Sequence, residues 1–154
     1  MAPTVAILIG LQASGKTTFV ARHLKAYCHI SKDHFPNVRN KAKRQQRLLE
    51  EALSVNKPIV LDNTNYSRVS RAPIIALAKE AGAHIVGYYF ESVATACCKR
   101  NRKREGKACV PDVAIYATLA KLERPSYDEG FDELHYVSIK ADRFKIEKWQ
   151  EEVD

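Results

Sequence analysis

The segment Gly10-Leu11-Gln12-Ala13-Ser14-Gly15-Lys16-Thr17-Thr18 predicts a phosphate-binding loop, because it fits the pattern G-x-x-x-x-G-K-[ST] at every fixed position. The glycines let the backbone turn with its N–H groups pointing inward, where they can hold phosphate oxygens. Lys16 can reach the β- and γ-phosphates of a nucleotide, and the Thr17 hydroxyl is placed to bind Mg²⁺. The phosphate-binding residues predicted here are Gly10, Gln12, Ala13, Ser14, Gly15, Lys16, Thr17 and Thr18.

The residues around this loop have the pattern that a phosphate loop requires. Residues 4–9 are almost continuously apolar, which is typical of a buried parallel strand, and residues 16–26 have a helical pattern. Further strands are expected at 28–31, 59–61, 83–90 and 134–139, and further helices at 38–53, 68–81, 91–104, 112–122 and, around Trp149, after 141. The sequence therefore predicts an α/β fold.

Length and composition limit the other classes. A chain of 154 residues forms one domain of ordinary size, here 1–154, and it has no apolar run of about 18 residues. The apolar start leads into the phosphate loop instead of a signal-peptide cleavage site, so we expect a soluble, cytoplasmic protein without a membrane partner or an evident obligate protein partner. The four cysteines form no C-x-x-C pair, which favours reduced thiols over a zinc site.

Charge is unevenly distributed along the chain. Residues 1–111 contain 19 Lys and Arg against 7 Asp and Glu, a balance of +12, and residues 112–154 contain 6 against 11, a balance of −5. The basic part contains the phosphate loop, and its charge exceeds what one triphosphate needs. This favours a polyanionic second substrate, with a generic basic surface as the alternative.

Two aspartates follow expected strands and are candidates for chemistry. Ligands of open α/β sheets bind beyond the carboxyl ends of the strands, so Asp33 should face the same crevice as the phosphate loop, where a carboxylate can deprotonate an attacking hydroxyl. Asp62 ends the apolar segment Ile59-Val60-Leu61, an arrangement in which the carboxylate approaches Mg²⁺, directly or through water. Either aspartate could instead cap a helix, and Ser67 or Ser70 could share the cap of the following helix.

Two basic segments accompany these carboxylates. The helix at 38–53 begins with five cations and no acid before Glu50, which suits a track for backbone phosphates as well as a solvated face. The second segment, about 99–111, is expected to form a mobile lid whose arginines close over the phosphates. A charged helix end before Gly106 is the alternative.

Taken together, the phosphate loop, Asp33, the Leu61-Asp62-Asn63-Thr64-Asn65 segment, the basic residues 99–107 with Val110-Pro111, and Glu129-Gly130-Phe131 resemble the polynucleotide 5′-kinases, both phage enzymes and the kinase domains of DNA-repair enzymes. The resemblance spans residues 5–139. It implies a three-layer P-loop kinase fold with a central parallel sheet of about five strands in the order 2-3-1-4-5. No D-x-D-x-T motif of the phosphatase half of the bifunctional members occurs in this sequence.

The resemblance also implies roles for single residues. Lys16, Asp33 and Arg104 would be catalytic, with Asp33 as the general base, and Thr17 and Asp62 would hold Mg²⁺. Arg100, Arg102 and Arg104 would contact the donor phosphates from the lid, and the nucleic-acid acceptor would meet Asp33, Arg39, Lys43 and Asn65. The phage enzyme has an arginine for the acceptor phosphate where this chain has Pro36, so Arg39 or the following basic helix would replace it.

The sequence thus predicts a kinase that transfers the γ-phosphoryl group of ATP to the 5′-hydroxyl end of DNA or RNA, with Mg²⁺ as cofactor. A small-molecule or zeta-toxin-like kinase could share the same core residues without needing the cations of 39–47. A nucleotide-gated binding module is a third candidate, although a module that only binds ATP would not require Asp33. The salt dependence of nucleic-acid binding distinguishes these classes.

Overall fold

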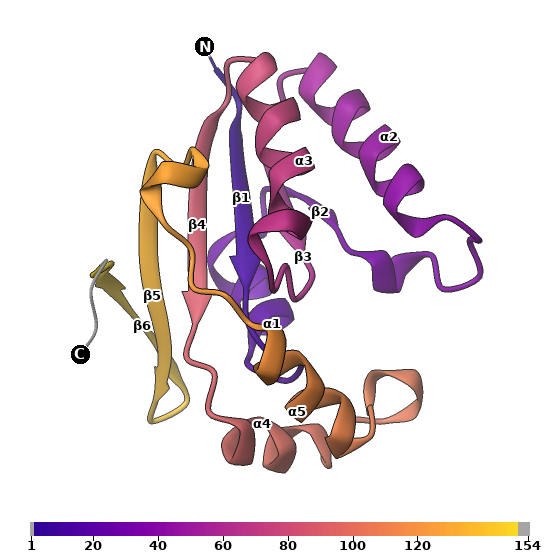
Figure 1. Cartoon of the computed structure of the whole chain (residues 1–154), viewed down its shortest axis with the longest axis vertical. Helices are drawn as coiled ribbons and strands as arrows, with labels where there is room; N and C mark the ends of the chain where they lie inside the picture. Colours follow the sequence, from indigo (N-terminus) through magenta and orange to yellow (C-terminus); the bar gives the residue numbers. More distant parts are fainter. Residues whose placement is uncertain (1, 151–154) are drawn as a thin grey trace.

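The computed structural model describes residues 2–150 and has a six-stranded sheet at its centre (Figure 1). The strands are β1 (Thr4–Ile9), β2 (Cys28–Ile30), β3 (Ile59–Asp62), β4 (His84–Phe90), β5 (Glu133–Lys140) and β6 (Arg143–Lys148). They lie in the order β2-β3-β1-β4-β5-β6, with β1 to β5 parallel and β6 antiparallel to β5. The expected order of the five parallel strands is confirmed, and a sixth strand is added at the edge.

Helices cover both faces of this sheet. They are α1 (Lys16–His23), α2 (Lys41–Ser54), α3 (Arg68–Glu80), α4 (Ala94–Asn101) and α5 (Asp112–Lys121), with 3₁₀ turns η1 (Lys32–His34), η2 (Gly106–Ala108) and η3 (Tyr127–Glu129). One core cluster joins β1 to α2 and α3, and another joins the opposite face of β1 to α1. The three-layer α/β prediction is therefore confirmed.

The central strand shows why the sequence before the phosphate loop is apolar throughout. In β1 the side chains of Val5 and Ile7 pack in the cluster that contains Ile75 of α3. Those of Ala6 and Leu8 point to the other face, where Phe19 of α1 lies. Because both faces of a parallel sheet are covered, successive residues must all be apolar.

The helix expected after residue 141 is wrong for the described part of that segment, which forms β6. Residues 143–147 alternate between charged and apolar side chains, the period of a strand. Ala141 and Asp142 both have positive φ, 49° and 62°, which is the geometry of a tight hairpin turn. Phe144 then packs edge-on against Phe19, at 5.2 Å between ring centroids. The rest of the expected helix, residues 151–154, lies outside the described residues.

The helix expected at 91–104 is shorter than predicted, because α4 spans only Ala94–Asn101. Asn101 is buried, accepts from the backbone N–H of Val110 at 3.0 Å and donates to the Val110 carbonyl. These two bonds close residues 102–109 into a loop between α4 and α5, below the arrowheads of β1 and β4 in Figure 1. Within residues 2–150, no helix has both the length and the hydropathy that crossing a membrane requires.

Candidate active site

The phosphate loop connects β1 to α1 and is held tightly by its surroundings. Gly15 has φ +100°, and a Cβ at this position would lie 3.1 Å from both Ile139 of β5 and Phe144 of β6. Glycine is therefore needed here for both conformation and space. Ala13 also adopts a left-handed conformation, with φ 61°, although it has a side chain.

Lys16 is buried inside the turn of this loop. Its ammonium group donates to the carbonyls of Gly10, at 3.0 Å, and Leu11, at 2.5 Å, and to the hydroxyl of Ser14 at 3.3 Å. Burial lowers the pKa of Lys16 to about 8, and the nearby charge of Asp62 offsets part of this effect. The cation is therefore held at the centre of the loop.

Asp62 lies at the end of β3 and receives two hydrogen bonds on the same oxygen. Thr17 donates its hydroxyl to Oδ2 of Asp62 at 2.8 Å, and Nε2 of His29 lies at 2.8 Å from the same atom. Burial raises the pKa of Asp62, but the hydrogen bonds with His29 and Thr17 and the charge of Lys16 outweigh it and hold the pKa below its usual value. The result is an anionic carboxylate beside a hydroxyl, both oxygen donors of the kind that Mg²⁺ prefers.

Helix capping is performed by other residues than the two aspartates. Ser31 caps η1 and accepts from the backbone N–H of Asp33, while Ser67 and Ser70 form a reciprocal capping box at the start of α3. The cap of α3 thus comes from the two serines that the sequence offered as an alternative, without Asp62. Asp33 is exposed within η1, so its carboxylate is accessible.

One cavity of about 880 Å³ connects the phosphate loop with Asp33. The phosphate-loop side of its lining consists of Gln12, Ala13, Gly15, Lys16, Thr17 and Thr18, with Arg100 and Arg104 from the lid side. It is also lined by Lys32 and Asp33 of η1, by Lys41 and Gln45 of α2, and by residues 62–66, which begin with the last residue of β3. A nucleotide on the loop and an acceptor beside η1 and α2, here called the acceptor end, would therefore share one space.

The three predicted lid arginines separate into two groups. Arg104 lines the cavity, and Arg100 donates to the carbonyl of Ala13 in the phosphate loop at 3.0 Å. Arg102 is exposed and pairs with Asp112 of α5 at 2.9 Å. Gln12 adds a link between the loop and α5, since its Nε2 donates to Thr118 at 3.0 Å.

The residues predicted to meet the acceptor are also divided. Asn65 lines the cavity but is buried, and its amide nitrogen donates to the carbonyl of Leu8 at 2.7 Å. Arg39 and Lys43 are exposed and are not among the described residues that line the cavity, whereas Lys41 and Gln45 of the same segment are. The roles of Arg39 and Lys43 in binding remain predictions.

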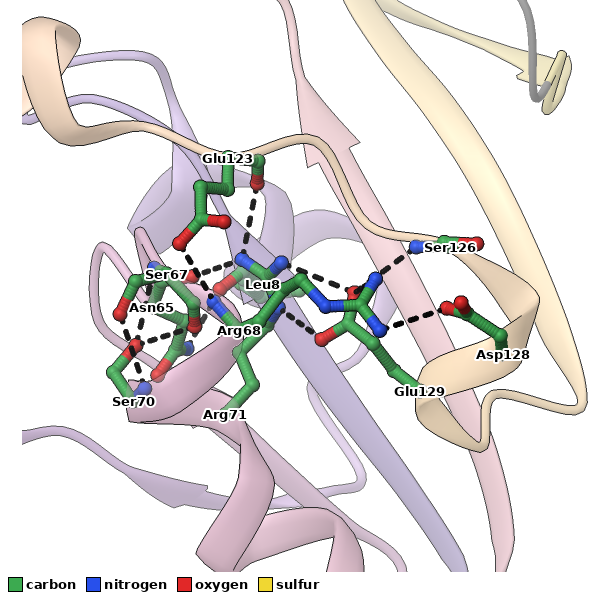
Figure 2. A network of polar contacts seen from close by, with 10 residues as sticks. All are labelled: Leu8, Asn65, Ser67, Arg68, Ser70, Arg71, Glu123, Ser126, Asp128 and Glu129. Atoms are coloured by element: carbon green, nitrogen blue, oxygen red, sulfur yellow. Dashed lines mark hydrogen bonds and ion pairs between the residues drawn. The ribbon is translucent and has the colours of Figure 1, made fainter.

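A buried arginine that we did not single out from the sequence supports the loop after β3 (Figure 2). Arg71 of α3 is fully buried and donates to both carboxylate oxygens of Glu129, at 2.9 and 3.1 Å. Its remaining nitrogen donates to the carbonyls of Asn65, at 2.7 Å, and Glu123, at 3.1 Å. Arg71 thereby joins α3 to the loop after β3, the segment after α5 and η3. Its spacing from Ile74, Ile75 and Ala78, on the apolar face of α3, was the available signal.

His29 is a second residue that sequence reasoning missed. The five histidines show no ligand spacing, and none was given a role. His29 reaches Asp62 only because β2 pairs with β3, which brings together residues 33 positions apart in the chain. No local pattern could have indicated this contact.

Comparison with known proteins agrees with this geometry. Residues 5–125 match the AAA domain family. A protein of Acanthamoeba polyphaga mimivirus, named as a candidate bifunctional polynucleotide phosphatase/kinase, is 30% identical over 157 residues, which cover 94% of this chain and 36% of that protein. The bifunctional polynucleotide phosphatase/kinase of Schizosaccharomyces pombe is 25% identical over 150 residues, with the same coverage of 94% and 36%. The chain thus spans about a third of the length of these curated relatives.

A solved structure supports the fold independently. A gluconokinase from Sinorhizobium meliloti superposes with a TM-score of 0.61 at 18% identity, covering 88% of this chain and 82% of that one. A likeness at this identity shows the architecture alone. With the phosphate loop and the family match over most of its length, the chain belongs to the AAA domain family, has the α/β P-loop kinase fold and is distantly homologous to bifunctional polynucleotide phosphatase/kinases.

Proposed function

We propose that this chain is a polynucleotide 5′-hydroxyl kinase, which transfers the γ-phosphoryl group of ATP to the 5′-hydroxyl end of DNA or RNA. The observation that carries the proposal is the shared cavity, which the phosphate loop and Asp33 both line. The names of the two curated relatives support the choice of a polynucleotide acceptor.

In this proposal the donor phosphates bind to the backbone N–H groups of the loop, and the Lys16 ammonium turns toward the β- and γ-phosphates. Thr17 and Asp62, the latter through water, would hold Mg²⁺, which would supply charge neutralisation on the phosphates. The described geometry fits this ion, because a hydroxyl and an anionic carboxylate lie side by side next to the loop.

Asp33 acts on the acceptor. Its carboxylate accepts the proton of the 5′-hydroxyl while that oxygen forms a bond to the γ-phosphorus and the bond from the γ-phosphorus to the β,γ-bridging oxygen breaks, releasing ADP. Arg104 lines the same cavity and stabilises the negative charge that spreads over the transferred group. Charge and positioning, more than covalent chemistry, supply the rate acceleration.

The charge of the surrounding surface favours a nucleic acid over a small acceptor. Lys32 and Lys41 line the acceptor end of the cavity, and further cations of α2 are exposed beside it. A strand that neutralises several of these cations should bind with a steep dependence on ionic strength. A small acceptor should show a shallow one.

The direct test incubates the purified chain with Mg²⁺ and γ-labelled ATP and four short oligonucleotides, DNA and RNA, each with a 5′-hydroxyl or a 5′-phosphate. Label on the 5′-hydroxyl strands alone is expected, and the ratio between DNA and RNA gives the acceptor preference. Bound ATP without label on any strand would contradict the proposal and favour a small-molecule kinase.

A further inference from the structure

We infer that Gln45 and Lys41 of α2 form a binding subsite for a phosphodiester oxygen, at the first internucleotide linkage of the acceptor strand. The inference rests on the proposed function, since it names where that substrate is held. The starting observation is that both residues line the acceptor end of the cavity.

A chain of hydrogen bonds determines which way the amide of Gln45 points. The backbone N–H of Lys32 can only donate, and it donates to Oδ1 of Asn63 at 2.9 Å. The other end of that amide, Nδ2 of Asn63, must therefore donate, and it does so to Oε1 of Gln45 at 2.7 Å. Gln45 consequently has its oxygen occupied by Asn63 and its Nε2 group directed away from it.

The Nε2 group of Gln45 is available to a ligand. The residue is only 6% exposed, and within residues 2–150 its Nε2 has no hydrogen-bond partner, while the side chain contributes to the cavity wall. Nε2 is not one of the described side-chain atoms that are fully buried without a partner, so the amide group reaches the open space of the cavity. The amide is thus a preoriented donor for a ligand oxygen.

Lys41 makes this an anion site. Lys41 and Gln45 are four residues apart in α2 and therefore lie on the same face of the helix, one turn from each other. Lys32 adds a second cation to the same end of the cavity. An ammonium group and an amide donor in the wall of one cavity suit a charged phosphate oxygen better than a neutral base carbonyl.

The same hydrogen bonds connect the subsite to the candidate base. Asn63 binds Gln45 on one side and the backbone of Lys32, the neighbour of Asp33, on the other. A phosphodiester held by Gln45 would therefore keep the adjacent 5′-hydroxyl at a fixed position relative to η1. In this way α2 would position the 5′-hydroxyl of the acceptor as well as attract its phosphates.

The test compares two acceptors that differ only in charge at the first linkage, a normal phosphodiester and a neutral methylphosphonate. The wild-type chain should use the neutral acceptor with a KM about 10-fold higher, because a hydrogen bond to a charged group is lost. Gln45→Leu and Lys41→Ala should raise the KM for the normal acceptor and show little further loss with the neutral one. The affinity for ATP should not change.

Two matched controls separate the subsite from general effects. Gln46→Leu changes the neighbouring glutamine, which is exposed and bonded to Glu50. Lys57→Ala removes one positive charge from the exposed turn before β3, at the amino end of that strand, and Lys57 is not among the residues that line the cavity. Both should retain the wild-type difference between the two acceptors, and the fluorescence of the single, buried Trp149 reports whether each variant is folded.

Three results would overturn the inference. Gln45→Leu and Lys41→Ala could keep the full wild-type sensitivity to the neutral linkage, or Gln46→Leu could lose it equally. Lys41→Ala, a change at a partly exposed position, supplies the answer if Gln45→Leu does not fold. Finally, a wild-type chain that phosphorylates no 5′-hydroxyl oligonucleotide would refute the proposed function itself, and the assigned ligand with it.

Discussion

The imidazole Nε2 of His29 lies 2.8 Å from Oδ2 of Asp62, the same oxygen that receives the hydroxyl of Thr17. Two donors on one oxygen fix the orientation of the carboxylate. In metal sites, mutation of a residue that orients a ligand through a hydrogen bond typically costs about 10- to 100-fold in metal affinity.

We expect His29→Leu to raise the Mg²⁺ concentration needed for half-maximal phosphoryl transfer by about 10- to 100-fold. The measurement is a titration of Mg²⁺ at saturating ATP and acceptor. His84→Ala is the control, because His84 pairs with Glu133 at the amino end of β4, away from the cavity. An unchanged Mg²⁺ requirement in His29→Leu would assign the contact to folding alone.

Asp33→Asn should reduce phosphoryl transfer by about 10²- to 10⁴-fold, the usual contribution of a general base. The amide keeps the shape of the carboxylate but does not accept the proton, and the phosphate loop is untouched, so ATP should bind as before. Transfer is measured with labelled ATP and binding by titration calorimetry. Asp142→Asn, in the exposed hairpin turn, is the charge-matched control. Substantial turnover in Asp33→Asn would exclude Asp33 as the base.

Arg104→Ala should slow transfer by about 100-fold, because it removes a positive charge that lines the cavity next to Lys16. Lys99→Ala removes an equal charge from the exposed side of α4 and should have little effect. Single-turnover rates of both variants give the comparison. If Arg104→Ala transfers the phosphoryl group as fast as Lys99→Ala, the segment after α4 is a solvated helix end without a role in transfer.

Lys16 should make stability depend on pH. Burial holds its folded pKa at about 8, below the unfolded value of about 10.4, so the unfolded chain binds more protons between these pH values. The Lys16 contribution to folding is therefore most favourable above pH 10.4 and is lost as the pH falls through 8. The difference in unfolding free energy between wild type and Lys16→Met should change in favour of the wild type by on the order of 3 kcal/mol from pH 7 to 10.5. Urea titrations at both pH values measure the two unfolding free energies. If their difference were the same at pH 7 and pH 10.5, the result would contradict the burial of Lys16.

Arg71→Met should lower the free energy of unfolding by about 3–5 kcal/mol, because it leaves Glu129 buried without its partner. Adding Glu129→Gln should recover part of this loss by removing the unpaired charge. Arg68→Met is the matched control. Arg68 is 43% exposed, so the loss should stay below about 1 kcal/mol although this arginine also approaches Glu129. Similar losses in both arginine variants would argue against a specific role for the buried one.

Local patterns were sufficient for most of the fold. The strands β1, β3 and β4 are almost continuous apolar runs, so their positions were predictable from the sequence, and the strand order was predictable from its resemblance. The error after residue 141 arose because the acidic tail around Trp149 suggested a helix, whereas the alternation at 143–147 and the hairpin turn favour a strand. Among the lid arginines, Arg100 and Arg104 line the cavity, whereas Arg102 pairs with Asp112.

Short-range patterns in the sequence were enough to predict the phosphate loop and the α/β architecture. They also predicted that Asp33 and Asp62 lie at the carboxyl ends of their strands, at the edge that parallel strands share. The folded chain was needed to show that His29 contacts Asp62, that Arg71 supports the loop after β3, and that Gln45 instead of an exposed neighbour lines the cavity. Each of these contacts joins residues from different elements, and the register of strand pairing and the rotation of a helix on the sheet set them. Those are results of packing over the whole chain that no local spacing encodes.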